Sequence, residues 1–364
     1  MKFKAAIIEK FNEGPNIREF EIEPLKKGEL LVKIESAGVC GSDLHIFSGK
    51  DPRITLPMIP GHEGVGVVAD LRDDRYDVRG KPLCEGDRII WDRGIVCGKC
   101  RYCLIEKRPY LCVNRKVYGI TFDINDESFP NGCYSEYIKL SEGTNVIKVS
   151  KDISPEVLVP VGCSGATSFH AVEESGLCGG GNVLIQGPGP LGIFTALFCK
   201  ERGVKRIIMT GSSKSKTRME LSMSFGVNHL LYRDKMTLEE QIDCVMDLTE
   251  GEGVDAVFEM AGTKSAVEDG QDFIKYGGVY VIAGISVPVG GVGIKVYENI
   301  VRKNGTIKGA WVSDTSHLVK TLEILEENRY PFEKLVSKKF LLNQAREAIE
   351  SVDDRDILKS VIML

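Results

Sequence analysis

At 364 residues the chain exceeds the size at which single hydrophobic cores stop growing, so we expect two domains. Its 47 basic and 52 acidic residues leave a net charge of −5, which gives no electrostatic reason for a nucleic-acid or anionic-membrane partner. No apolar run approaches the ~20 residues of a membrane span, and the odd number of 11 cysteines favours metal binding or reduced thiols over disulfides, so we expect a soluble cytoplasmic protein.

The first part of the chain alternates short β-rich runs with turns such as Gly14-Pro15 and Lys27-Gly28. This rhythm is typical of an antiparallel, barrel-like domain. The charged segment 70–85 interrupts it, and we expect an exposed loop there. The predicted strands cover residues 5–8, 17–21, 30–34, 65–69 and 88–91, and strand character returns at 132–138 and 146–149.

One short stretch holds a thiolate, an imidazole and a carboxylate, at Cys40, His62 and Glu63. All three are zinc-ligand types, and a catalytic zinc takes three protein ligands and leaves one position open. Cys40 and His62 would supply two ligands, and the third must come from elsewhere. Ser42 and His45 follow closely enough to pass a proton from the open side to solvent. Taken alone, the stretch is equally compatible with a buried cysteine and a structural histidine in a glycine-rich turn.

A second cluster contains cysteines only. Three of them stand two residues apart and the fourth follows nine residues later, so that they can surround a single ion. Four thiolates with no open position are typical of a structural zinc site. Reduced surface thiols are the alternative, but exposed thiols oxidise and regular spacing has no packing reason. The predicted ligands are Cys97, Cys100, Cys103 and Cys112.

Near residue 160 the pattern changes from strands to a helix entrance, which contains Cys163. This cysteine is far in sequence from both clusters. An isolated cysteine is more often a core thiol than a metal ligand. The residues alone therefore do not make Cys163 a ligand.

The next segment has the arrangement of a dinucleotide site. A short buried strand at 182–186 runs into a Gly-x-Gly-x-x-Gly turn and then into an apolar helix at 193–201. The glycines allow a tight turn and close backbone approach, and the helix N-terminus attracts a pyrophosphate. Because proline lacks an N–H, the residues after it must supply the amide donors. The predicted cofactor-binding residues of this turn are Gly187, Gly189, Pro190, Leu191 and Gly192.

The second strand of this unit, at 206–210, ends at Gly211. An NAD site usually places an acidic residue about 20 residues past the glycines, to bind the ribose hydroxyls. Here a glycine is followed by hydroxyl and basic side chains, which suit a 2′-phosphate and favour NADP over NAD. The alternative is a solvated basic loop before a helix at 217–225. The candidate residues are Gly211, Ser212, Ser213, Lys214 and Lys216.

Strands and helices continue to alternate, which predicts a parallel doubly wound sheet and an α/β fold class. A helix at 317–328 and a final strand at 360–364 are expected to return to the first domain. We expect Ala261, Ala283 and Ile285 to contact the cofactor. The intervening predicted elements are helices at 238–249 and 266–275 and strands at 256–260, 279–283 and 305–310.

Taken together, these features resemble the zinc-dependent medium-chain alcohol dehydrogenase family. The resemblance covers nearly the whole chain and includes Gly-His-Glu-x-x-Gly at 61–66, the four-cysteine lobe and the glycine turn. It implies two zinc ions, a nicotinamide cofactor, a small-molecule substrate and a homo-oligomer, either a dimer or a tetramer. The implied domains are a GroES-like, partly open β-barrel catalytic domain at 1–163 and 312–364, with a structural zinc lobe at 93–113, and a Rossmann domain at 164–311.

The resemblance also assigns roles to single residues. Cys163 stands seven residues before His170, as the family's third catalytic ligand does, which promotes it to a ligand beside Cys40 and His62. Glu63 then corresponds to a catalytic residue next to the histidine or to an alternative ligand. A cysteine at 163, where sorbitol dehydrogenases carry a carboxylate, departs from their pattern.

Further roles are implied at the proton relay, the cofactor and the substrate. Ser42 and His45 match the family's relay, and Lys359 matches a basic residue that approaches the pyrophosphate. Trp91 and Arg93 lie on the segment that borders the substrate site in relatives. An arginine there would favour polar or anionic substrates, and the alternative is an arginine turned outward to solvent.

The substrate class remains open. Oxidation of a secondary alcohol, polyol or sugar is one reading, and a threonine or amino-alcohol dehydrogenase is the alternative, because residues 95–100 resemble threonine dehydrogenases. Zinc-free reduction of quinones or enones is opposed by the ligand set. A non-catalytic nucleotide sensor would have lost a ligand, and none is missing. The segments 70–85 and 122–131 are longer than usual in the family, and it assigns them no role.

Overall fold

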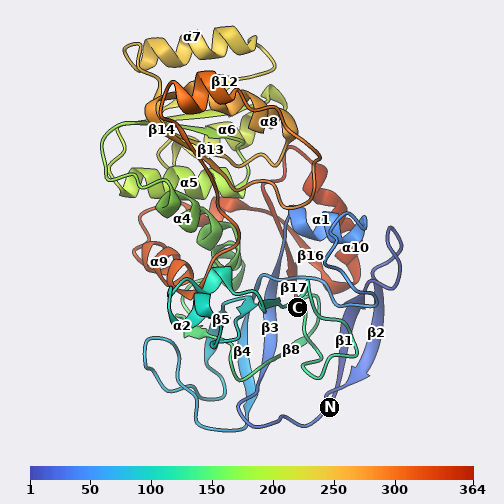
Figure 1. The fold of residues 1–364 in the computed structure, drawn as a ribbon. Helices are drawn as coiled ribbons and strands as arrows, with labels where there is room; N and C mark the ends of the chain where they lie inside the picture. Colours follow the sequence, from blue (N-terminus) through green and yellow to red (C-terminus); the bar gives the residue numbers. More distant parts are fainter. The chain divides into compact units, whose positions relative to one another are not determined.

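The computed structural model describes residues 1–364 and divides into two compact units. Figure 1 follows the chain from the N-terminus to the C-terminus by colour. The first unit comprises Met1–Cys163, Ser313–Glu323 and Leu335–Leu364, and the second comprises Ser164–Val312 and Ile324–Lys334.

One helix belongs to both units. Helix α9 (Thr315–Glu326) begins in the first unit and ends in the second. Beyond it, Tyr330 stacks on Phe225 with ring centroids 6.1 Å apart, and Phe332 stacks on Phe194 at 6.0 Å. The sequence predicts all of 312–364 for the first domain. This aromatic packing is the reason why residues 324–334 lie in the second unit instead.

The first unit is built on a seven-stranded sheet of order β16-β17-β3-β4-β5-β9, with β8 paired to β3. Neighbouring strands are antiparallel except β16 and β17, which are parallel. Two small antiparallel pairs, β1–β2 and β6–β7, complete it. The strands are β1 (Lys2–Ile7), β2 (Asn16–Glu21), β3 (Leu30–Val39), β4 (Gly64–Leu71), β5 (Arg88–Trp91), β6 (Gly94–Ile95), β7 (Lys116–Val117), β8 (Tyr137–Leu140), β9 (Val146–Lys148), β16 (Val336–Leu341) and β17 (Lys359–Met363).

Most predicted strands of this unit are present, but the predicted strand at 132–138 is wrong in its first half. The N–H groups of Cys133 and Tyr134 donate to the carbonyls of Gly61 and Pro60, outside any regular ladder. Regular pairing with β3 starts only at Tyr137. The predicted loop at 70–85 contains no helix or strand after the end of β4. The helices that lie wholly in this unit are short: α1 (Gly41–Phe47), α2 (Arg101–Leu104), α3 (Pro155–Leu158) and α10 (Ala345–Glu350).

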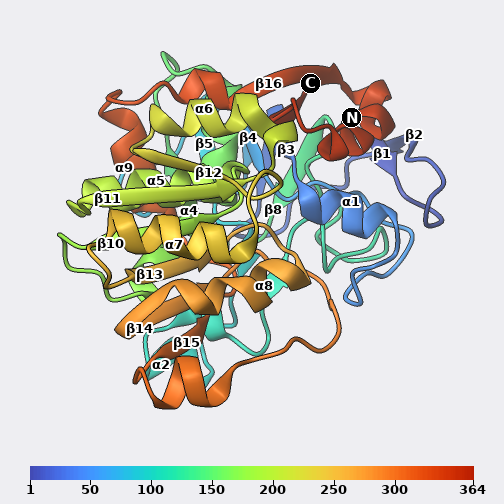
Figure 2. The same cartoon turned by 90° about the horizontal axis from the view of Figure 1, so that it is seen from above.

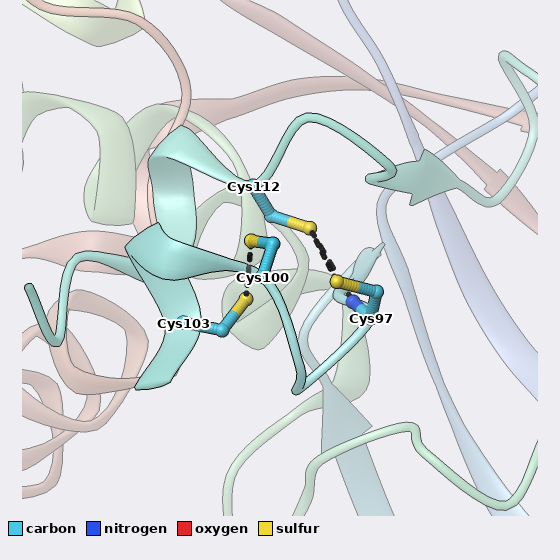
Figure 3. A group of neighbouring side chains, drawn as sticks. All are labelled: Cys97, Cys100, Cys103 and Cys112. Carbon is cyan, nitrogen blue, oxygen red and sulfur yellow. Dashed lines mark hydrogen bonds between the residues drawn. The ribbon is translucent and has the colours of Figure 1, made fainter. Parts of the chain in front are cut away.

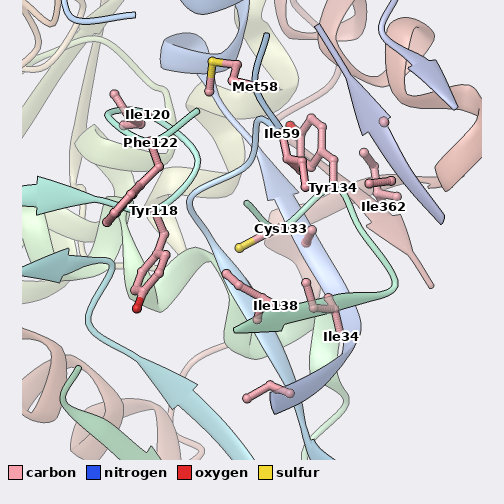
Figure 4. Close-up of a cluster of buried hydrophobic side chains, with 14 of the residues drawn as sticks. Ile34, Met58, Ile59, Tyr118, Ile120, Phe122, Cys133, Tyr134, Ile138 and Ile362 are labelled. Atoms are coloured by element: carbon pink, nitrogen blue, oxygen red, sulfur yellow. The ribbon is translucent and has the colours of Figure 1, made fainter. Parts of the chain in front are cut away.

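A single apolar cluster forms the core of the first unit (Figure 4). Ile34 on β3, Ile138 on β8 and Tyr134 are all buried in it. Tyr118 and Phe122, with ring centroids 5.4 Å apart, extend the cluster, and both rings are buried. Each fully buried side chain of this size stabilises the fold by about 1.5–3 kcal/mol, so this core fixes the strand ends from which the site residues project.

The second unit contains a parallel sheet of order β12-β11-β10-β13-β14-β15. Figure 2 shows the successive strands β11, β10, β13 and β14 with helices alongside them. The order reverses between β10 and β13, so that the topological switch point lies there. The strands are β10 (Asn182–Gln186), β11 (Arg206–Gly211), β12 (His229–Tyr232), β13 (Val254–Glu259), β14 (Ile274–Ile282) and β15 (Thr306–Gly309), and the helices wholly in this unit are α4 (Ser164–Glu174), α5 (Pro190–Glu201), α6 (Lys216–Met223), α7 (Leu238–Leu248) and α8 (Lys264–Gly270).

Helices cover both faces of this sheet. Leu184 of β10 packs in a cluster with Val245 of α7. Its neighbour Ile185 points to the other face, where Gly192 of α5 comes so close that an added Cβ would lie 3.4 Å from the Ile185 side chain. The predicted α/β, doubly wound fold class is therefore confirmed.

One predicted helix is too long. The sequence predicts a helix at 266–275, but α8 ends at Gly270 and β14 begins at Ile274. A Cβ at Gly270 would overlap Gln186 and the Tyr280 hydroxyl, so the helix ends in a close contact with the sheet. Strand β12 was not among the predicted elements. None of the helices combines the length and apolar character needed to cross a membrane.

Candidate metal centres and dinucleotide site

Four side chains of metal-binding type meet in the first unit. The ligand atoms of Cys40, His62, Glu63 and Cys163 all lie within 4.8 Å of one another. The Sγ of Cys40 lies 3.3 Å from His62 Nε2, and the Sγ of Cys163 lies 3.6 Å from the same nitrogen. Tetrahedral zinc, with bonds of about 2.0–2.3 Å, separates its ligand atoms by about 3.3–3.8 Å. The two sulfurs and the nitrogen therefore fit one zinc ion.

The sheet brings these residues together. Cys40 follows the end of β3, and His62 and Glu63 directly precede β4, its antiparallel neighbour. The end of one strand thus lies beside the start of the next. Cys163 arrives from the 3₁₀ turn Val159–Gly162, which packs against β3 and β4.

Asp43 holds this arrangement in place, and sequence reasoning missed it. Its Oδ2 accepts the backbone N–H of Cys40 at 2.8 Å, and its Oδ1 lies 3.5 Å from His62 Nδ1. A carboxylate on the far nitrogen orients a ligating histidine and fixes its tautomer. The available signal was an acidic residue three positions after Cys40, where a helix N-terminus favours it.

Glu63 is paired with a buried lysine. Its Oε2 lies 2.6 Å from the Nζ of Lys359, and both side chains are almost completely buried. A Cβ at position 38 would overlap the Glu63 carboxylate, so Gly38 leaves the space for it. The sequence predicts Lys359 as a pyrophosphate ligand, and this ion pair is a partner that the prediction did not include.

The charges of this cluster shift its pKa values. A hydrogen bond from Cys163 holds the pKa of the Cys40 thiol well below its ordinary value, and the pKa of Cys163 is raised. Burial would lower the pKa of His62, but the negative charges of Cys40 and Asp43 raise it to about 10. The cluster therefore concentrates negative charge, which a divalent cation would neutralise in place of the proton on His62.

The two predicted relay residues lie on helix α1. Ser42 and His45 are three positions apart, on the same side of the helix, and both are partly exposed. Burial, assisted by the positive charge of Lys50, lowers the pKa of His45 from its ordinary value. The imidazole is thus neutral near pH 7 and can accept a proton.

The two predicted substrate residues are both buried. Trp91 belongs to the core, and its ring lies against Gly64 together with Cys133. This packing gives no support to a role for Trp91 in a substrate pocket. Arg93 does not turn outward to solvent, because its Nη1 donates to the carbonyl oxygen of Gly162 at 2.7 Å. The guanidinium group therefore holds the backbone next to Cys163.

The four predicted cysteines converge at the second cluster (Figure 3). The sulfurs of Cys97 and Cys112 are 3.6 Å apart, and those of Cys100 and Cys103 are 3.5 Å apart. Both distances fit edges of a tetrahedral zinc–sulfur site. Backbone N–H groups, first that of Lys99, lower the pKa of Cys97 to about 6. The set has no open position and fits a structural ion.

The glycine turn has the geometry that close backbone approach requires. Gly187 adopts φ +105°, which favours glycine, and a Cβ at Gly192 would overlap the Gly187 carbonyl oxygen. Gly189 precedes α5, and a Cβ there would meet open space. Pro190 is the first residue of α5, so the free N–H groups come from Leu191 onward. The turn therefore fits a pyrophosphate at the helix N-terminus.

The end of β11, where an acidic residue is missing, is closely packed. A Cβ at Gly211 would lie only 2.5 Å from the sulfur of Met219, so a larger residue would have to displace it. The N–H and hydroxyl of Ser213 both donate to the Asp234 carboxylate, at 2.6 and 2.5 Å. The sequence predicts Ser213 as a phosphate donor, and the structure gives both its donors to a carboxylate from the loop after β12. Ser212 accepts the Lys214 N–H at 3.2 Å, and Lys216 lies 3.6 Å from Glu220.

The loops with Ala261, Ala283 and Ile285 follow β13 and β14 at the carboxyl edge of the sheet. The N–H of Ala261 donates to the side chain of Glu259 at 2.8 Å, and that of Ala283 donates to its backbone carbonyl at 3.1 Å. Ala261 and Ala283 thus share one buried anchor, Glu259, which sequence reasoning did not identify.

Comparison with known proteins agrees with this geometry. Residues 26–151 match the family model of the alcohol dehydrogenase GroES-like domain, and residues 190–327 match that of the zinc-binding dehydrogenases. The GroES-like part of the predicted fold class is thereby confirmed.

Similar whole proteins are known. An alcohol dehydrogenase from Geobacillus stearothermophilus is 32% identical and aligns with 88% of this chain and 87% of its own length. An L-threonine 3-dehydrogenase from Bacillus velezensis is 29% identical over 85% of this chain and 83% of its own. The crystal structure of an alcohol dehydrogenase from Thermotoga maritima superposes with a TM-score of 0.95 and 42% identity, and the match covers 100% of this chain and 99% of that one.

Proposed function

Since this chain belongs to the zinc-dependent medium-chain alcohol dehydrogenase family, we propose that it moves a hydride between an alcohol carbon and a nicotinamide dinucleotide. The family makes it an oxidoreductase. The proposed substrates are secondary alcohols, polyols or sugars, which give ketones or aldehydes. The convergence of Cys40, His62 and Cys163 within zinc-binding distances is the observation that carries this proposal.

Two zinc ions are part of the proposal. Cys40, His62 and Cys163 would hold the first, with Glu63 as a neighbouring acceptor, and the four-cysteine cluster would hold the second. A catalytic zinc polarises an alcohol oxygen and lowers its pKa, which makes loss of the proton possible near neutral pH. Metal analysis of the purified protein tests this directly. Two zinc ions per chain are expected, and one or none contradicts the proposal.

The chain's own residues would move the alcohol proton outward. Ser42 can accept it, and the neutral imidazole of His45, one helical turn further along α1, can pass it to solvent. Asp43 keeps His62 in the tautomer whose Nε2 faces the two sulfurs. Arg93 holds the peptide that carries Cys163. These contacts preorganise the site before any substrate arrives.

The finer proposal on the cofactor is a preference for NADP over NAD. A nicotinamide cofactor supplies the hydride acceptor. Gly211 adds no carboxylate to repel a 2′-phosphate, and Lys214 and Lys216 can donate charge-assisted hydrogen bonds to it. Asp234 opposes this preference, because it already accepts both donors of Ser213.

Measuring kcat/KM with each cofactor tests this preference. A clear advantage for NAD in the native protein contradicts it. Asp234→Asn removes the negative charge but keeps a side chain that can bond Ser213. It should raise the NADP to NAD ratio by about three- to tenfold, as expected for one exposed charge beside a phosphate.

Threonine or a related amino alcohol is the second candidate substrate. The similarity to the L-threonine 3-dehydrogenase of Bacillus velezensis favours it, while the similarity to alcohol dehydrogenases favours simple alcohols. A panel of secondary alcohols, polyols, sugars and threonine, followed by nicotinamide absorbance, separates the two. Activity on threonine alone would replace the first proposal, and activity on none would contradict both.

A cytoplasmic location and a homo-oligomeric state complete the proposal. The 11 cysteines, all unpaired, support a reducing compartment. The exposed apolar side chains of Tyr276, Tyr297 and Val301 support contact with another copy. Light scattering of the purified protein tests the second point, and a monomer contradicts it.

A further inference from the structure

A buried carboxylate lies at the topological switch point of the parallel sheet. Glu259 is the last residue of β13, and it pairs in register with Gln186, the last residue of β10. The strand order reverses between these two strands, and ligands of such sheets bind at the carboxyl ends there. The Glu259 side chain is completely buried. It therefore lies beneath the place where the fold puts a dinucleotide.

Three backbone N–H groups converge on this carboxylate. Ala261 and Gly262 donate to Oε1 at 2.8 and 2.6 Å, and Gly284 shares its N–H between Oε2 at 3.1 Å and the Glu259 backbone carbonyl at 2.9 Å. The first two belong to the loop after β13 and the third to the loop after β14. Both oxygens act as acceptors, which is the pattern of an ionised carboxylate. One anion thus holds two loops of the cofactor edge together.

The packing leaves no room for a different anchor. A Cβ at Gly284 would lie 2.7 Å from Glu259 Oε2 and 2.6 Å from the Gly262 nitrogen. A Cβ at Gly262, whose φ is +71°, would lie 2.7 Å from the Gly284 carbonyl oxygen. The two loops therefore approach each other at glycines directly around the carboxylate.

This buried charge has no cationic side chain as a partner. None of the ion pairs of the structure includes Glu259, and its hydrogen bonds come from neutral peptide groups. Amide dipoles stabilise the charge but do not cancel it, and the low polarity of the interior extends its field. Burial raises the pKa of this carboxyl, and the N–H groups of Gly262, Ala261 and Gly284 oppose that rise. In its ionised form Glu259 places a negative charge at the cofactor edge.

We infer that Glu259 is a positioning residue whose charge makes the site discriminate between the two redox forms of the cofactor. This inference rests on the proposed function. The oxidised nicotinamide ring carries one positive charge and the reduced ring is neutral. A fixed anion at the switch point attracts only the charged ring, so it raises affinity for the oxidised form. Glu259 would act through the two loops to which it is hydrogen-bonded.

The test separates the effect of the charge of residue 259 from the effect of its side-chain length. Glu259→Gln keeps the size of the side chain and removes its charge. Glu259→Asp keeps the charge and makes the side chain shorter. Dissociation constants of the oxidised and the reduced dinucleotide are measured separately on the zinc-loaded enzyme, by fluorescence of the reduced form and by its displacement. ADP-ribose, which lacks the nicotinamide ring, serves as the control ligand for damage to the rest of the site.

In Glu259→Gln, affinity for the oxidised form should fall by about 5- to 20-fold relative to the reduced form, as a unit charge at moderate distance predicts. Glu259→Asp should weaken both forms by a similar factor and keep their ratio. If Glu259→Gln leaves the ratio of the two dissociation constants unchanged, whether both affinities fall equally or neither falls, the inference is overturned. Glu259 is then a structural anchor only.

A second matched pair covers the case in which Glu259→Gln does not fold. Glu259→Asp and Glu259→Asn differ only in charge at the shorter length, and the same drop in the ratio is expected between them. An equal ratio in this pair overturns the inference as well. A native enzyme that binds neither dinucleotide contradicts the proposed function itself, which is a distinct outcome.

Discussion

The two sulfur-rich clusters of the first unit differ in what stabilises their thiolates. At the four-cysteine cluster, backbone N–H groups of the same short loop lower the pKa of Cys97. At the Cys40, His62 and Cys163 cluster, a hydrogen bond from Cys163 and then the charge of His62 lower the pKa of the Cys40 thiol, and the buried Lys359, from a distant segment of the chain, adds to the same effect. The first cluster lies in a single loop, residues 97–112, whose four thiols can surround an ion. The second is assembled by segments of the first unit that lie far apart in the sequence.

This difference has a chemical meaning. A closed set of four thiolates satisfies a zinc ion and leaves nothing to react, so its contribution is folding energy. An open set needs neighbours that keep the ligands in place and control the charge around the free position. The contrast predicts that equivalent changes at the two clusters have different consequences.

The largest effect is expected at the open cluster. Cys163→Ala removes one of three ligands and should lower kcat by at least about 10³-fold, because the ion is no longer held with an open position. Circular dichroism should show an intact fold. The control is Cys133→Ala, which alters a buried thiol of the same unit that is not in the proposed ligand set. Wild-type turnover in Cys163→Ala would remove the distinction between the clusters.

The second effect concerns the buried ion pair, which the four-cysteine cluster lacks. Lys359→Met leaves the Glu63 carboxylate buried without its partner at 2.6 Å. Breaking a buried pair in this way costs about 3–5 kcal/mol, to be measured by denaturant unfolding. Lys139→Met is the control, because this lysine is equally buried but donates only to a backbone carbonyl at 3.3 Å. Equal losses in the two variants would mean that the charge of Glu63 is not the cause.

The third effect is a loss of stability at the closed cluster. Cys100→Ser should weaken zinc binding there, and each hundredfold loss of affinity removes about 2.7 kcal/mol of stabilisation. Turnover per folded molecule should stay near the wild-type value. Cys84→Ser, at an exposed cysteine outside both clusters, is the matched control and should change neither quantity. If Cys100→Ser has the wild-type free energy of unfolding but a low kcat, the roles assigned to the two clusters are reversed.

The same contrast explains what the sequence could predict. The convergence of the four cysteines between Cys97 and Cys112 could be predicted from their spacing alone, because one loop holds them all. The glycine turn at 187–192 is local in the same way, and the structure gives it the expected geometry. The order of strands and helices in the second unit was also predictable, since each element carries its own periodicity.

The residues that escaped prediction depend on contacts between distant segments. The Glu63–Lys359 pair joins residues almost 300 positions apart, and no local pattern marks it. Asp234 reaches Ser213 only because β12 lies beside β11, and β12 itself was not predicted. Trp91 is in the core because β5 pairs with β4. Its place in the sequence, next to Arg93, could not distinguish a pocket wall from a core residue.

The smallest expected effect is on the pH dependence of the open cluster, through His45. Burial lowers the pKa of this imidazole below its ordinary value of 6.5. The neutral form accepts the proton, so kcat/KM should be maximal above that pKa. As pH falls through it, His45 becomes protonated and kcat/KM should decrease, with the midpoint below 6.5.

His45→Gln should lower activity by about tenfold, less than a base that touches the reacting atom contributes, and should abolish this acidic limb. Zinc in the four-cysteine cluster should be retained equally in both proteins over the same range, because His45 does not belong to that cluster. A limb that persists unchanged in His45→Gln would assign the titration to another group.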